Sequence, residues 1–80
     1  MSTFPSVAVL PFDDLSAGRN FGYFGDGVAE DIITALSRFP DLAVVARTSS
    51  FTYKGKAIDI RRVGQELGVG YVVEGSVRKD

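Results

Sequence analysis

The residues best suited to chemistry in this chain are carboxylates, cations and hydroxyls, because its 80 residues include no histidine and no cysteine. Those absences remove thiolate nucleophiles, imidazole bases and zinc sites built from nitrogen and sulfur ligands. The strongest ligand-binding candidates are Asp13 and Asp14, which follow one apolar run, and Arg47 and Ser49, which follow another. We predict no catalytic residue, no metal site and no cofactor.

These four residues would lie together only if the runs 7–10 and 42–47 are parallel strands of one sheet. Residues 7–10 are unbroken apolar sequence, which is typical of a strand buried on both faces. Ligands of open α/β sheets bind beyond the carboxyl ends of the strands. Asp13 and Asp14 could there hold Mg²⁺ or Ca²⁺. Arg47, Thr48, Ser49 and Ser50 could cradle an anion. The simpler interpretation is a solvated turn at the aspartates and a self-bonded loop at the second site.

Three glycines, Gly22, Gly25 and Gly27, precede a helical pattern, where phosphate-binding loops also lie. Their spacing is not that of a dinucleotide fingerprint, and Asp26 would repel a phosphate, so we interpret them as a turn. The pattern then predicts a helix over 26–39 with Asp26 as its N-cap.

The elements alternate between strand and helix. The sequence predicts a strand at 7–10, a helix at 26–39, a strand at 42–47, a helix capped by Asp59 and stopped by Gly68, and a strand at 71–77; residues 48–57 form a loop with one helical turn. This βαβαβ order predicts parallel strands in a three-layer α/β/α fold. Right-handed crossovers and the two-sided apolar first strand favour the order 2-1-3.

In that order the third strand is an edge. It carries Tyr71, Val72, Val73 and Glu74, and no proline protects its backbone groups. We therefore predict self-association of two copies through this edge. We also expect the chain to be a piece of a larger protein that stops before a further hairpin.

The charge is nearly balanced, at −1 overall, with a basic excess in the second half. Aromatic and basic residues gather at Phe51, Tyr53, Lys54, Lys56, Arg61 and Arg62, as single-stranded nucleic acid would require. A pI near 5.2 and the lack of a continuous basic face lead us not to expect nucleic-acid binding. No apolar stretch approaches the length of a membrane span, so we expect no membrane insertion.

Four ordered motifs resemble one known family. They are AVLPFDDLS within 7–16, YFGDG with EDIITALS within 23–37, ARTSSFTYKG at 46–55, and VGQELGV with YVVEGSVR within 63–78. Together they are similar to the N-terminal domain of TolB and to related modules of bacterial multi-domain proteins. Loop 17–20 departs from the usual acidic, proline-containing loop of that family.

The resemblance covers nearly the whole chain, so we interpret residues 1–80 as a single domain. It implies an α/β/α fold like the anticodon-binding domain of class II aminoacyl-tRNA synthetases. It implies attachment to adenylate cyclases, winged-helix regulators or tetratricopeptide repeats, and a periplasmic location; the cytoplasm is equally compatible with the composition. We interpret the chain as a non-enzymatic module for protein interaction or sensing. The alternatives are a sensor of a small ligand or nucleotide and an RNA-binding module.

Overall fold

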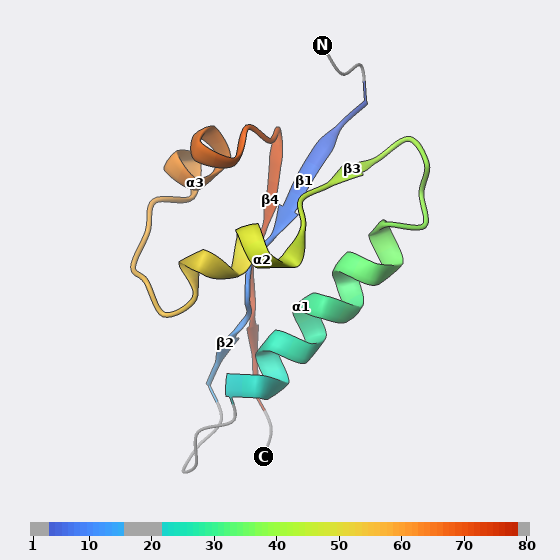
Figure 1. The fold of residues 1–80 in the computed structure, drawn as a ribbon. Coiled ribbons are helices and arrows are strands. Elements are labelled where there is room, and N and C mark those ends of the chain that lie inside the picture. Colours follow the sequence, from blue (N-terminus) through green and yellow to red (C-terminus); the bar gives the residue numbers. More distant parts are fainter. Residues whose placement is uncertain (1–3, 16–21, 79–80) are drawn as a thin grey trace.

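Strand β1 (Ser6–Val9) is the centre of the fold in the computed structural model, which describes residues 4–15 and 22–78 (Figure 1). It lies between β3 (Ala43–Val44) and β4 (Tyr71–Val73) in a parallel sheet of order β3-β1-β4. Val7 pairs with both neighbours, and Val7 to Leu10 are buried. The predicted 2-1-3 order and the two-sided burial of the first strand are confirmed.

A second parallel ladder continues the first. It pairs β2 (Asp13–Asp14) with β5 (Ser76–Val77). The N–H of Leu10 donates to the Val73 carbonyl and that of Asp13 to the Gly75 carbonyl, each at 3.0 Å, so one segment advances three residues while its partner advances two. This extra residue is a β-bulge, and it falls where Pro11 has no N–H to give.

The second ladder corrects two predictions. Asp13 and Asp14 form a short strand rather than the solvated turn that we favoured. The predicted strand at 71–77 is divided into β4 and β5, because its partner changes register at the bulge. The strand predicted at 42–47 is shorter than expected, since only Ala43–Val44 pairs with β1.

Two longer helices cover the sheet from opposite sides. Helix α1 (Gly22–Leu36) packs against β1, β2 and β5, and α3 (Ile60–Leu67) packs against β4 (Figure 1). Between β3 and α3 the chain forms helix α2 (Arg47–Ser50), which lies beside β1, and then the 3₁₀ turn η1 (Phe51–Tyr53). The arrangement is the predicted three-layer α/β fold.

Helix α1 begins earlier than the sequence predicts. Gly22, Gly25 and Gly27 belong to the helix, so the predicted glycine turn is wrong, and so is the assignment of Asp26 as N-cap. A Cβ atom on Gly25 would lie inside van der Waals contact of the Phe12 carbonyl oxygen and 3.0 Å from its carbonyl carbon. The glycine is therefore needed for close approach of helix and strand, not for a turn.

Helix α3 begins and ends as predicted. The Asp59 carboxylate accepts a hydrogen bond from the N–H of Arg61 at 3.0 Å, which caps the first turn. Gly68 ends the helix at φ 68°, in the left-handed region. Val63 is 1% exposed and anchors the helix to the core.

Candidate functional site

A cleft of about 430 Å³ opens where β1 and β4 end. Its walls come from the bulged segment 10–14, from the connection 53–58 with Ile60, and from Glu74 and Gly75. This is the carboxyl edge of the parallel strands, the place where ligands of open α/β sheets bind. The bulge contributes to the cleft by turning the chain after β1 away from the line of the sheet.

The cleft brings acidic and basic side chains together. Asp13, Asp14 and Glu74 come from the strand side, and Lys54 and Lys56 come from the connection before α3. In the part of the chain that the structure describes, no three His, Cys, Asp or Glu residues gather so as to hold a metal ion. The mixed charge would suit a ligand that carries both signs.

Lys54, which lines the cleft, is held in place by an ion pair with helix α1. Its Nζ donates to Asp26 Oδ2, and the Asp26 side chain is 14% exposed. The second oxygen of this carboxylate, Oδ1, is buried and has no hydrogen-bond partner. The pair ties the connection before α3 to α1. Lys54 makes this contact with half of its side chain still exposed, and Lys56 is exposed too.

Arg47 and Ser49, the other two predicted ligand-binding residues, do not line the cleft. Both lie in α2, where the Arg47 guanidinium stacks 4.3 Å from the centre of the Phe51 ring. Arg47 Nε also donates to Glu30 Oε1 of α1 at 2.8 Å. The structure thus brings Asp13 and Asp14 together with lysines from the connection, and directs Arg47 toward α1.

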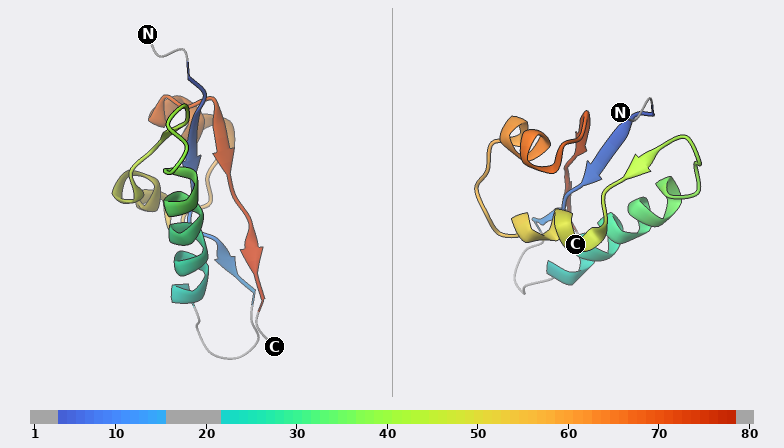
Figure 2. Two further views of the ribbon diagram at one scale, coloured as in Figure 1. Left: turned by 90° about the vertical axis from the view of Figure 1, so that its right-hand side faces the viewer. Right: turned by 45° about the horizontal axis from the view of Figure 1, so that its top comes forward.

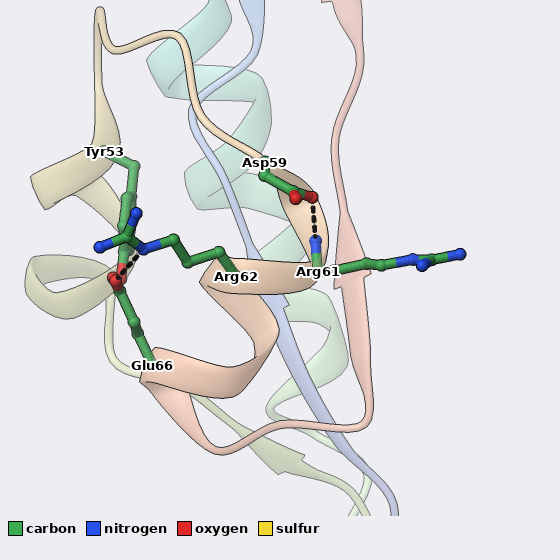
Figure 3. A network of polar contacts seen from close by, with 5 residues as sticks. All are labelled: Tyr53, Asp59, Arg61, Arg62 and Glu66. Atoms are coloured by element: carbon green, nitrogen blue, oxygen red, sulfur yellow. Dashed lines mark hydrogen bonds and ion pairs between the residues drawn. The ribbon is translucent and has the colours of Figure 1, made fainter.

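A polar network joins the same connection to α3 (Figure 3). The Tyr53 hydroxyl donates to Glu66 Oε1 at 2.7 Å, and Arg62 Nε donates to Glu66 Oε2 at 3.0 Å. The hydrogen bond from Tyr53, and then that from Arg62, lowers the pKa of the Glu66 carboxyl below its ordinary value. The hydrogen bond to Glu66 raises the pKa of the Tyr53 hydroxyl. Tyr53 is thereby fixed in one wall of the cleft.

The contacts also bear on the nucleic-acid alternative. Of the aromatic and basic residues that motivated it, Phe51 lies under Arg47, Tyr53 and Arg62 bind Glu66, and Lys54 binds Asp26. Stacking on single strands needs rings and cations that face solvent together. Here Phe51, Tyr53, Lys54 and Arg62 each contact another side chain of the protein, although Lys54 and Arg62 remain exposed.

The sequence reasoning did not foresee the positions of two residues, Glu74 in the cleft and Ser50 in the core. Glu74 lines the cleft, and the rule that ligands bind beyond strand ends would have found it if applied to the third strand. Ser50 is fully buried and its Oγ has no hydrogen-bond partner. No signal in the sequence marks that burial, because Ser50 lies among polar residues.

None of the helices in residues 4–15 and 22–78 is both long enough and apolar enough to cross a bilayer.

Comparison with known proteins gives one informative match. No protein-family model matches the chain. No solved structure matches it either. The chain is 63% identical over 75 residues to the protein named Putative adenylate cyclase 3 of Rhizobium meliloti (strain 1021). The match spans 94% of this chain and 13% of that protein, so the chain is similar to a small part of a much larger protein.

Proposed function

We propose that this chain is a non-catalytic module of a larger bacterial signalling protein, which couples protein contact or sensing to an attached output domain of the adenylate cyclase type. The observation that carries the proposal is the 63% identity to a stretch comprising 13% of Putative adenylate cyclase 3. Most of that protein lies outside the matching stretch and is available for other domains.

We further propose that the module is of the kind found at the N-terminus of TolB. Contacts between its sequence motifs support this. Gly25 of the second motif packs on Phe12 of the first, Glu30 of the second binds Arg47 of the third, and Tyr53 of the third binds a residue of the fourth, Glu66. The motif residues therefore serve to hold the fold together, as expected of a structural module.

The proposal is tested in the Rhizobium relative. Deleting the matching stretch should leave formation of cyclic AMP from ATP measurable while changing its rate or its response to cell extract. The purified 80-residue chain, supplied with ATP and Mg²⁺ or Mn²⁺, should form no cyclic AMP. Cyclic AMP production by the chain alone, or a deletion that leaves rate and response unaltered, would contradict the proposal.

A ligand-sensing role is the second candidate, and the cleft favours it. Its volume of about 430 Å³ falls within the range of small-molecule sites. Titration with ATP, cyclic AMP and single-stranded RNA, followed by amide chemical shifts, separates the alternatives. Shifts confined to Asp13, Lys56 and Glu74 support a sensor, shifts over Phe51 and Arg61 support RNA binding, and no shifts support the interaction module.

A further inference from the structure

The open border of the sheet is longer than β4 alone. Strands β4 and β5 follow one another along a single edge, which Figure 2 shows as one extended ribbon running the length of the molecule. In the part of the chain that the structure describes, each is the last strand of its ladder. The edge therefore extends from Tyr71 to Val77.

The hydrogen bonds show which backbone groups this edge presents. The carbonyls of Val73, Gly75 and Val77 accept from the N–H groups of Leu10, Asp13 and Leu15 at 3.0, 3.0 and 2.8 Å, respectively. Because successive residues of a strand direct their backbone groups to opposite sides, those of Val72, Glu74 and Ser76 face away from β1 and β2. The alternation of inward-facing and outward-facing residues continues without a break from Val73 to Val77, because the extra residue of the bulge lies between Leu10 and Asp13.

Such an edge is a template for another strand. It contains no proline, and its only charged side chain between Tyr71 and Val77 is Glu74.

Charge distinguishes between two registers for pairing with a second copy. An antiparallel pair centred on Glu74 would place two carboxylates directly opposite, which is destabilising. A pair centred on Ser76 instead places Glu74 of each copy opposite Arg78 of the other, and both side chains are exposed. Opposite charges at directly paired positions stabilise a sheet.

We propose that two copies of this chain pair antiparallel through residues 74–78, the part of this edge that contains β5, about a two-fold axis at Ser76, with reciprocal Glu74–Arg78 contacts. The backbone groups of residues 74, 76 and 78 then exchange hydrogen bonds between copies. So short an edge gives a weak dimer that forms only at high concentration. The pairing does not depend on the proposed signalling function, and its test uses no cyclase.

Charge reversal tests the register by sedimentation velocity over a range of concentrations. Glu74→Arg and Arg78→Glu should each weaken the dimer by tenfold or more, because each places like charges opposite. The double variant Glu74→Arg/Arg78→Glu should restore it. Asp31→Arg, at an exposed position on α1, is the matched control and should leave the dimer unchanged. Circular dichroism shows that each variant is folded.

Cross-linking tests the axis independently of charge. The chain has no cysteine, so Ser76→Cys introduces a single thiol at the proposed axis, and the control Ser37→Cys places one at an exposed site after α1. We expect Ser76→Cys to oxidise to a covalent dimer at least tenfold faster than Ser37→Cys. A monomer at every concentration, a dimer insensitive to both charge reversals, or equal rates of cross-linking would overturn the proposal.

Discussion

Helices α1 and α3 cover opposite sides of the same sheet, yet they are attached to it by different kinds of contact. In α1 the attachment is a close backbone approach, with Gly25 against the Phe12 carbonyl and Ala29 fully buried. In α3 it is a capped start at Asp59, a left-handed stop at Gly68 and one buried side chain, Val63.

These two kinds of attachment predict different losses of stability when residues of each helix are substituted. A methyl group added at a close backbone contact has no room, so it pushes the helix and the strand apart and the whole contact is lost. Caps and polar contacts at exposed helix ends each contribute about 1 kcal/mol, so they are lost one at a time. Substitutions in α1 should therefore have large or negligible effects, and those in α3 intermediate ones.

The largest effect is expected for Gly25→Ala. Its Cβ would overlap the Phe12 carbonyl group, so we expect a loss of about 3 kcal/mol, the upper end of the usual cost of overpacking, or failure to fold. Urea unfolding followed by circular dichroism measures it. Gly27→Ala is the matched control, since a Cβ there meets nothing within 4 Å and should stabilise the helix by up to about 1 kcal/mol. Equal effects at the two positions would remove the distinction between the helices.

Gly68→Ala should be the next most damaging. Gly68 has φ 68°, a conformation that costs other residues about 1–2 kcal/mol. Gly64→Ala, in the interior of the same helix, would place its Cβ in ordinary contact at 3.6 Å from the Val69 carbonyl oxygen, and we expect it to be neutral or stabilising by up to about 1 kcal/mol. Chemical denaturation of both variants gives the comparison; unchanged stability of the Gly68→Ala variant would show that the stop is not strained.

Removing the cap of α3 with Asp59→Ala should cost about 1 kcal/mol, because the N–H of Arg61 loses its acceptor. Asp59→Asn retains an acceptor and should recover most of that loss. Thermal melts of the two variants, beside Asp31→Ala as an exposed control in α1, measure the difference. The prediction is wrong if Asp59→Ala melts with the control.

The smallest effect is a pH dependence from the Tyr53–Glu66 contact. Its stabilisation is fully present between the ordinary pKa of the Glu66 carboxyl, 4.5, and that of the Tyr53 hydroxyl, 10.0. It is lost as pH falls through the lowered pKa of Glu66, and as pH rises through the raised pKa of Tyr53. Tyr53→Phe should reduce the change of the unfolding free energy with pH at both the acidic and the alkaline end. Ultraviolet titration should give the Tyr53 hydroxyl a pKa above 10.0. A pKa at or below 10.0 would contradict the hydrogen bond to Glu66.

Local sequence rules predicted correctly those features that depend on residues close together in the sequence. The cap at Asp59 and the stop at Gly68 depend on residues within one turn, and the sheet order follows from the apolar run at 7–10. The start of α1 could not be found in this way, because the role of Gly25 depends on Phe12 from another element. The bulge escaped prediction for the same reason, since it is a difference between two paired segments.

The candidate site was predicted in part. Asp13 and Asp14 do line the cleft at the carboxyl edge, as the strand-end rule requires. Arg47 was misplaced because its choice of partner, Glu30, depends on how α1 lies beside α2. A strand-end rule locates an edge of the sheet, but it does not say which side chains from the connections reach it.

The central position of β1 in the sheet affects how the chain folds while it is being synthesised. The strand is synthesised before both of its neighbours, yet its pairing is complete only after Tyr71–Val73 has followed. Until then the nascent chain presents its most apolar segment, Val7 to Leu10, without β4, one of the two strands that flank β1. Contacts so distant in sequence form slowly. On the ribosome this segment is therefore where we expect a chaperone to bind, and where an interrupted chain would aggregate.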